Sequence, residues 1–171
     1  MLQVTLQDHD RLSKNDFLGQ VTLNLNDIQP NVRTEKWYDL GESFHGNIKL
    51  QLKYDDTSHE LAVTVKEAKD LIPIRANGVV DPYVKLYLLP DKKKASKQKT
   101  KAVKNSTRPT YNETLKYTLN PATDSQRVLQ VSVWDNEGSF SHDPLGQCEI
   151  PLSVIMEEHS MSEWFALVRD D

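Results

Sequence analysis

Hydrophobic and polar residues alternate with a period of two in short segments of the chain from residue 47 onward. The alternation is clearest in 47–54 (NIKLQLKY), 60–65 (ELAVTV), 83–89 (YVKLYLL), 113–119 (ETLKYTL) and 128–134 (VLQVSVW). Shorter examples are 98–103 (QKTKAV), 145–150 (LGQCEI) and 163–167 (EWFAL). This period places successive side chains on opposite faces of a strand, and the Pro, Gly, Asn and Asp residues between the segments are typical of turns. Eight half-buried strands predict an antiparallel β-sandwich, in which only PLSVIMEEHS at 151–160 would form a helical turn or two.

Part of this pattern occurs twice. LQVTLQDHDRLSKNDFLGQVTLNLNDI at residue 2 aligns without gaps to LQVSVWDNEGSFSHDPLGQCEIPLSVI at residue 129. The same offset (129 − 2) relates Trp37 to Trp164 and Leu40 to Leu167, which lie beyond these segments. An ungapped match of this length indicates a repeated structural unit.

The repeat divides the chain. Residues 1–40 correspond to the last third of one unit, residues 41–46 form a short polar linker, and residues 47–171 form a complete second unit. We expect Leu145 and Trp164 to be buried in this second unit.

Charge is distributed unevenly along the chain. The net charge of the whole chain is −4, yet the stretch from Lys85 to Arg108 holds nine basic residues against one acid, Asp91. A local excess of this size on an acidic chain is typical of a basic patch with an anionic partner. The single Cys148 cannot form an internal disulfide, which suits a reducing, cytosolic compartment, and its alternating surroundings predict a packed thiol rather than a nucleophile.

Strand geometry gathers part of this charge on one face. If Val84, Leu86 and Leu88 point inward, the neighbouring positions of the same strand point outward. The outward positions of this strand and of the next are basic or aromatic: Tyr83, Lys85, Tyr87, Lys97, Lys99 and Lys101. Ammonium groups converging from adjacent strands suit a phosphorylated headgroup, whereas the alternatives are unspecific attraction to anionic lipid or a merely solvated face.

Several motifs identify a resemblance. The sequences DPYVKLYLLPDKKK, SKQKTK, RPTYNETL, LQVSVWD and DPLG occur in this order and are similar to C2 domains of conventional protein kinase C, the synaptotagmins and the extended synaptotagmins. The resemblance implies an all-β, eight-stranded antiparallel Greek-key β-sandwich whose loops at one end bind Ca²⁺ and acidic phospholipid. Residues 1–40 resemble the last three strands of a preceding C2 domain, which implies a parent protein with tandem C2 domains.

The resemblance also assigns roles to particular residues. The positions that bind phosphoinositide in the protein kinase C domain correspond here to Tyr83, Lys85, Lys97, Lys99 and Trp134, and we include Lys101 on the same face. A further position, Asn in that family, is His142 here. The implied function is a phospholipid-binding module that docks its parent on phosphatidylinositol bisphosphate membranes. Its implied location is the cytosolic face of the plasma membrane, including endoplasmic reticulum contact sites, which extended synaptotagmins tether.

The family's calcium-ligand positions are only partly acidic here. They correspond to Arg75, Asp81, Asp135, Glu137 and Asp143, and Arg75 replaces an acid. A guanidinium a few ångströms from Ca²⁺ repels it by ~1–4 kcal/mol, depending on the local dielectric. We therefore expect weak or absent Ca²⁺ binding, with a single ion at Asp81, Asp135 and Asp143 as the alternative.

The partial first unit carries the corresponding carboxylates of one loop only. These are Asp8, Asp10 and Asp16, whose first-loop partners would lie outside the chain. Because Ca²⁺ takes six to eight oxygen ligands, this fragment alone should not complete a site.

Other function classes have less support from the sequence. The five histidines are scattered and no nucleophile or phosphate-loop motif is present, so we expect no enzymatic activity. The basic stretch contains little Arg on an acidic chain, which argues against a nucleic-acid partner. A protein-interaction adaptor with defective calcium loops and Ca²⁺-dependent phospholipid binding both remain alternatives.

Overall fold

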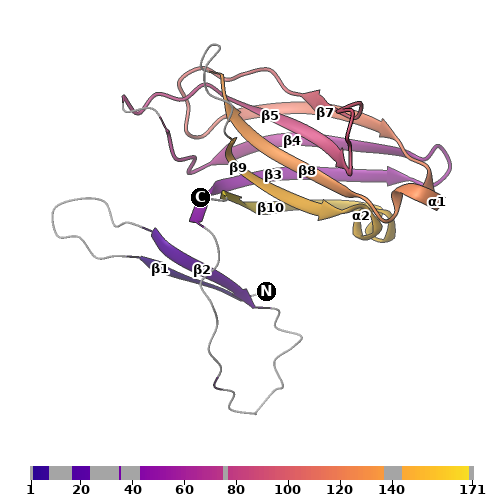
Figure 1. The fold of residues 1–171 in the computed structure, drawn as a ribbon, viewed down its shortest axis with the longest axis horizontal. Coiled ribbons are helices and arrows are strands. Elements are labelled where there is room, and N and C mark those ends of the chain that lie inside the picture. The colour runs from indigo at the N-terminus through magenta and orange to yellow at the C-terminus, as the bar shows by residue number, and fades with distance from the viewer. Residues whose placement is uncertain are drawn as a thin grey trace. The chain divides into compact units, whose positions relative to one another are not determined.

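The computed structural model of the 171-residue chain describes residues 2–7, 17–23, 35, 43–74, 77–136 and 144–169. The strands are β1 (Leu2–Gln7), β2 (Phe17–Leu23), β3 (Ser43–Asp55), β4 (Glu60–Lys69), β5 (Pro82–Leu89), β6 (Gln98–Lys99), β7 (Thr110–Thr118), β8 (Val128–Asp135), β9 (Pro144–Pro151) and β10 (Ser160–Arg169). The helices are α1 (Pro121–Asp124) and α2 (Leu152–Glu158). Two compact units result, one with β1 and β2 and one from His45 to Val168 (Figure 1).

In the first unit β1 and β2 form an antiparallel pair. The register runs from Leu2 opposite Leu23 to Leu6 opposite Gly19, and it shifts between Leu6 and Gln7. The third strand expected for this unit falls outside the described residues, so the domain boundaries at 1–40, 41–46 and 47–171 stay predictions.

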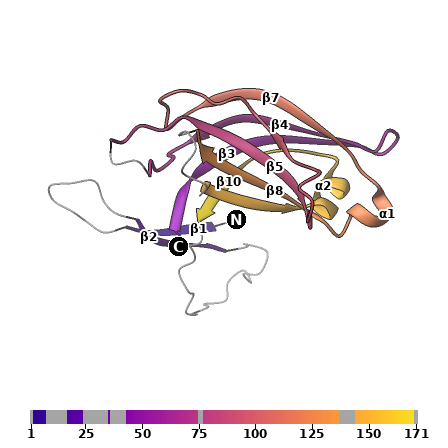
Figure 2. The same cartoon turned by 45° about the horizontal axis from the view of Figure 1, so that its top comes forward.

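The second unit contains eight antiparallel strands in the order β6-β5-β8-β9-β10-β3-β4-β7. From β6 the chain crosses to β7 at the other end of this order and then returns to β8 beside β5, which is a Greek-key connection. Figures 1 and 2 show the strands folded into two layers around the core. The predicted eight-stranded antiparallel sandwich is confirmed.

Side chains connect the two ends of the strand order. The Gln98 amide on β6 donates to the carbonyl oxygen of Lys116 on β7 at 2.6 Å. The backbone N–H of Lys101 donates to the Glu113 carboxylate at 2.9 Å. These bonds satisfy polar groups at the edges that would otherwise be left for pairing with another chain, so the sandwich is nearly closed.

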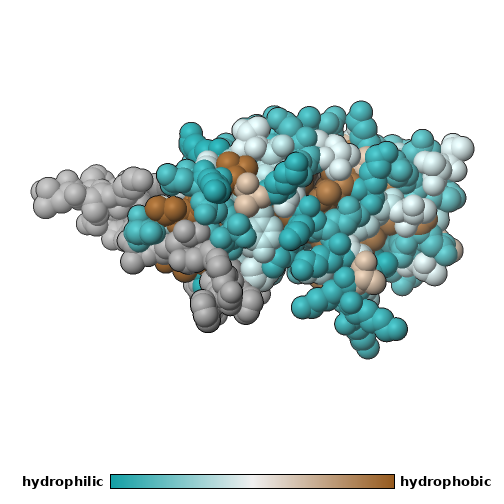
Figure 3. Space-filling view, turned by 90° about the horizontal axis from the view of Figure 1, so that it is seen from above, coloured by the Kyte–Doolittle hydropathy of each residue, from teal (hydrophilic) through white to brown (hydrophobic). Residues whose placement is uncertain are grey.

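The core follows the predicted alternation. On β5, Val84, Leu86 and Leu88 are buried, with exposed fractions of 0%, 0% and 4%, while the residues between them are only partly buried. Burying each such side chain contributes about 1.5–3 kcal/mol. On the outside, hydrophilic side chains cover most of the coloured surface visible in Figure 3.

The prediction for Leu145 is confirmed and that for Trp164 is wrong. Leu145 is fully buried, whereas 39% of Trp164 is exposed. On β10 the buried residue is Leu167, three positions away, so Trp164 points to the opposite face of the strand. There the Lys69 ammonium lies 4.4 Å from the centroid of the indole ring and that of Lys49 lies 5.7 Å from it.

Both helices are short and lie at the same end of the sandwich in Figures 1 and 2. Asn120 caps α1 by accepting a hydrogen bond from the N–H of Ala122 at 3.1 Å. The predicted helical turns at 151–160 are confirmed as α2, which buries Leu152 and Ile155. Within the described residues no helix has the length and apolar character needed to cross a membrane.

Candidate functional site

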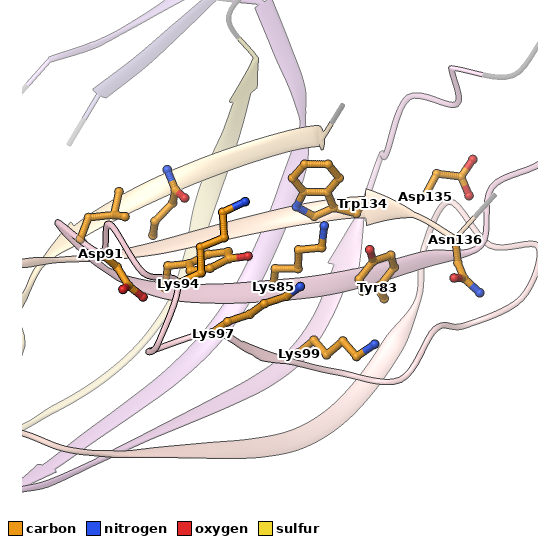
Figure 4. A pocket seen from close by; sticks show the side chains of 12 residues that line it. Tyr83, Lys85, Asp91, Lys94, Lys97, Lys99, Trp134, Asp135 and Asn136 are labelled. Atoms are coloured by element: carbon orange, nitrogen blue, oxygen red, sulfur yellow. The ribbon is translucent and has the colours of Figure 1, made fainter. Parts of the chain in front are cut away.

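An open groove of about 780 Å³ lies over the outward-facing residues of β5, β6 and β8 and the adjoining turn. Its lining is formed by Tyr83, Lys85, Tyr87, Leu89, Asp91, Lys94, Lys97, Lys99, Gln130, Trp134, Asp135 and Asn136. Figure 4 shows Lys85 in the middle of the groove, Asp91 and Lys94 toward one end, and Asp135 and Asn136 at the other. Four lysines therefore face one cavity.

The register of the three strands brings these side chains together. Lys85 on β5 is opposite Lys99 on β6 and opposite Ser132 on β8, and Tyr83 is opposite Trp134. Directly opposed side chains in an antiparallel pair have Cβ atoms about 4.5–5.5 Å apart. Residues far apart in the sequence thus form a continuous basic and aromatic surface across the sheet.

The indole of Trp134 is held in place beside Lys85. Its Nε1–H donates to the Ser132 hydroxyl at 2.8 Å, and that hydroxyl, on a buried residue, donates to the Lys85 carbonyl at 3.4 Å. The Lys85 Nζ lies 3.4 Å from the centroid of the Trp134 ring and 5.4 Å from that of Tyr83. The two rings therefore orient the central ammonium by cation–π attraction.

Positive charge exceeds negative charge in the groove, whose lining holds four lysines against Asp91 and Asp135. Partial burial is the main cause that lowers the pKa of Lys85 to about 8, and repulsion by Lys97, Lys94 and Lys99 lowers it further. Burial likewise raises the pKa of Tyr83, so its hydroxyl stays protonated and available as a donor. A cluster of cations that disfavour one another is stabilised when an anion enters between them.

The turn between β5 and β6 adds a lysine that strand periodicity does not reveal. The Asp91 carboxylate accepts hydrogen bonds from the N–H groups of Ser96 at 2.8 Å and Ala95 at 3.0 Å. Hydrogen bonding by the Ser96 hydroxyl is the main cause that lowers the pKa of Asp91. Lys94 adopts a φ of +54° within this turn and reaches the groove. The sequence signal for this turn was an Asp followed directly by three lysines.

Five of the six predicted lipid-binding residues line the groove. They are Tyr83, Lys85, Lys97, Lys99 and Trp134. Lys101 does not line it, because β6 ends at Lys99 and the chain turns toward β7. His142 lies outside the described residues. The role of these residues in lipid binding stays a prediction.

Two of the predicted calcium ligands lie side by side. The N–H of Asp81 donates to the Asp135 carboxylate at 2.9 Å, and the Asp81 carboxylate accepts from the N–H of Asn105 at 2.7 Å. Asp81 directly precedes β5 and Asp135 is the last residue of β8, so both lie at the end of the sandwich remote from α1 (Figure 1).

The other predicted positions, Arg75, Glu137, Asp143 and, in the first unit, Asp8, Asp10 and Asp16, lie outside the described residues. Within the described ranges no three His, Cys, Asp or Glu side chains form a metal-binding group. Two converging carboxylates fit part of a Ca²⁺ site but fall short of the six to eight oxygens that the ion takes.

Comparison with known proteins matches the chain to the family model of the C2 domain over residues 1–40 and 59–167. The chain belongs to the C2 domain family. It is 38% identical to "Synaptotagmin 1" of Drosophila melanogaster over 124 residues, which cover 72% of this chain and 26% of that protein. It is 34% identical to "Synaptotagmin-B" of Diplobatis ommata, covering 85% of this chain and 35% of that protein. This C2 chain therefore spans about a quarter to a third of the length of these curated relatives.

The solved crystal structure of a RIM C2 domain from Drosophila matches this C2 chain with a TM-score of 0.65 and 31% identity, covering 73% of this chain and 99% of that domain. C2 domains of the synaptotagmin and RIM type are non-enzymatic modules that bind lipids or proteins. That this particular chain catalyses no reaction stays a prediction.

Cys148 is partly exposed, packs against the core, and has its pKa raised to about 12 by burial, which keeps it a thiol.

Proposed function

We propose that the complete C2 unit binds the headgroup of phosphatidylinositol bisphosphate in the groove over β5, β6 and β8. The observation that carries this proposal is the convergence of Lys85, Lys94, Lys97 and Lys99 on one open cavity. Each ammonium offers three donors on a flexible stem, which suits several phosphates around a ring. The module docks its parent protein on anionic cytosolic membranes such as the plasma membrane, including contact sites with the endoplasmic reticulum.

The aromatic residues favour a bound headgroup over diffuse attraction to anionic lipid. Tyr83 and Trp134 flank Lys85, and the Ser132 hydroxyl holds the indole by accepting a hydrogen bond from its N–H. A side chain that is already oriented loses less conformational entropy on binding than a free one, by about 0.5–1.5 kcal/mol. Exposed lysines in a turn have no such orientation and contribute charge alone.

We propose further that Ca²⁺ has little influence on this binding. The groove lies on the sheet face, and Arg75 replaces one of the acids expected at the end of the sandwich. The adjacency of Asp81 and Asp135 supports a second candidate, in which one weakly held Ca²⁺ assists attachment to phospholipid. A protein partner at the same groove is a further outcome of the test below.

Flotation of the whole chain with liposomes separates these possibilities. The double variant Lys97→Ala with Lys99→Ala removes two groove lysines, and Lys92→Ala with Lys93→Ala removes two exposed turn lysines as a charge-matched control. A lysine near an anionic leaflet contributes about 1 kcal/mol, so each pair should weaken binding to phosphatidylserine vesicles by up to about thirtyfold. Only the groove variant should also lose the preference for vesicles that contain phosphatidylinositol bisphosphate.

Three outcomes of this assay are distinct. Equal loss of preference in both double variants would mean that the groove holds no specific headgroup site. Binding of the unmodified chain only when Ca²⁺ is added would favour the second candidate. Failure of the unmodified chain to float with any anionic vesicle would contradict the lipid proposal and favour a protein partner.

A further inference from the structure

Lys85 has a different environment from the exposed lysines around it. Its Nζ is partly buried against Trp134, at 3.4 Å from the ring centroid. Among the described residues no carboxylate forms an ion pair with it, whereas the Lys116 ammonium lies 2.8 Å from the Glu60 carboxylate. Lys85 is thus the central amine of a groove lined by three further lysines and by the carboxylates of Asp91 and Asp135 toward its ends.

This environment favours the neutral amine, which is the nucleophilic form. With its pKa lowered to about 8, Lys85 is neutral in a much larger share of molecules near neutral pH than a lysine of ordinary pKa. An amine shifted in this way by burial and neighbouring cations is the usual form of an activated lysine nucleophile. Lys85 lines the open groove, which a small reagent can enter.

The neighbouring lysines select the reagent. Lys94, Lys97 and Lys99 line the same cavity and attract phosphate, so a reagent that carries phosphate is concentrated next to Lys85. A neutral reagent gains nothing from these charges. The groove therefore combines a reactive amine with an anion-binding surface.

We propose that Lys85 is an acylation site for small phosphate-bearing acyl donors, with the neighbouring lysines holding the phosphate of the donor. With acetyl phosphate, the neutral Nζ attacks the carbonyl carbon and a C–N bond forms. The bond from carbon to the phosphate oxygen breaks, inorganic phosphate leaves with the electron pair, and the amine proton passes to water. The amide product carries no charge at the centre of the groove.

The test incubates the whole chain with acetyl phosphate at pH 7.5 without lipid and follows each lysine by peptide mass spectrometry. Lys85 should react at least about tenfold faster than Lys92 and Lys93, which are exposed internal controls in the same molecule. Inorganic phosphate, which competes for the same groove lysines, should slow the reaction of Lys85 with acetyl phosphate more than that of Lys92 and Lys93. Equal rates at the three lysines, or no effect of phosphate at Lys85, would overturn the proposal.

Two variants test whether the selective acetylation of Lys85 depends on the groove. Lys97→Ala should slow acetylation of Lys85, because it removes a charge that attracts the phosphate and lowers the pKa of Lys85, and Lys92→Ala, which removes an exposed turn charge, should leave it unchanged. Equal loss of Lys85 reactivity in both variants would contradict the role of the groove lysines.

One consequence rests on the proposed function: acetylated chain should bind phosphoinositide vesicles less well. Because labelling is measured without lipid, selective acetylation with unchanged vesicle binding would contradict only the proposed function. Unselective acetylation with a groove-dependent vesicle preference would contradict only this inference.

Discussion

Replacement of Trp134 by Leu tests whether the aromatic wall of the groove orients the basic residues. The change keeps an apolar side chain but removes the ring that lies 3.4 Å from the Lys85 ammonium. A flexible side chain that is already oriented spares about 0.5–1.5 kcal/mol of ordering cost on binding. A loss of about 1 kcal/mol corresponds to roughly fivefold weaker binding.

The chain provides a matched control for this substitution. Trp164 on β10 also lies under lysine ammonium groups, with Lys69 at 4.4 Å, but it does not line the groove. Trp164→Leu should therefore leave binding to phosphatidylinositol bisphosphate vesicles unchanged. Sedimentation titrations of both variants, with thermal melts to verify folding, give the comparison.

A role for the Trp134 indole in binding is refuted if folded Trp134→Leu binds these vesicles as tightly as the unmodified chain. It is refuted equally if the two tryptophan variants lose the same affinity. Equal losses would mean that the effect of replacing a tryptophan does not depend on whether it lines the groove.

Three further predictions concern calcium and pH. Millimolar Ca²⁺ should raise the melting temperature of the chain only slightly, and Arg75→Asp should enlarge that rise. A large rise with a micromolar midpoint in the unmodified chain would contradict the expectation of weak Ca²⁺ binding. Binding to phosphoinositide vesicles should weaken as the pH rises through about 8, where Lys85 loses its proton, and Lys85→Arg should lack this dependence; a flat profile for the unmodified chain would refute it. His159 has its pKa raised first by the Glu157 carbonyl and then by Asp56, both of which it contacts through its ring nitrogens. The resulting stabilisation is complete below the unfolded pKa near 6.5 and is lost as the pH rises through the raised value. Urea midpoints of His159→Gln should consequently vary less with pH over this window, and an unchanged pH profile would contradict the assignment.

The strands, and the side of β5 that faces outward, were predictable because the hydrophobic period of two in the sequence sets both. Alternation identified Val84, Leu86 and Leu88 as inward, and the positions between them as the groove face, as the structure has them. The same rule, applied to β10, would have placed Trp164 outward, since Leu167 is an odd number of positions away and is buried. The expectation that Trp164 is buried did not apply this rule, and the match of Trp37 to Trp164 in the repeat does not indicate which face the side chain occupies.

The rest of the groove depends on local backbone geometry. Lys94 enters through a turn that Asp91 organises by accepting hydrogen bonds from two backbone N–H groups, and alternation carries no information on such turns. Lys101 shares the parity of Lys97 and Lys99, yet its N–H is directed to Glu113 of β7 at the sheet edge. Strand ends of this kind are set by tertiary hydrogen bonds, which a single sequence does not specify.

The central claim is that a phosphorylated inositol headgroup binds among the lysines of β5 and β6 and the indole of β8. The most direct measurement is an NMR titration of the chain with soluble inositol 1,4,5-trisphosphate, following the lysine ammonium-linked methylene and tryptophan indole signals. We predict saturable shifts at Lys85, Lys97, Lys99 and the Trp134 indole, with the Trp164 indole unaffected and no requirement for Ca²⁺. Shifts confined to the exposed turn at Lys92 and Lys93, or that appear only with Ca²⁺, would contradict it.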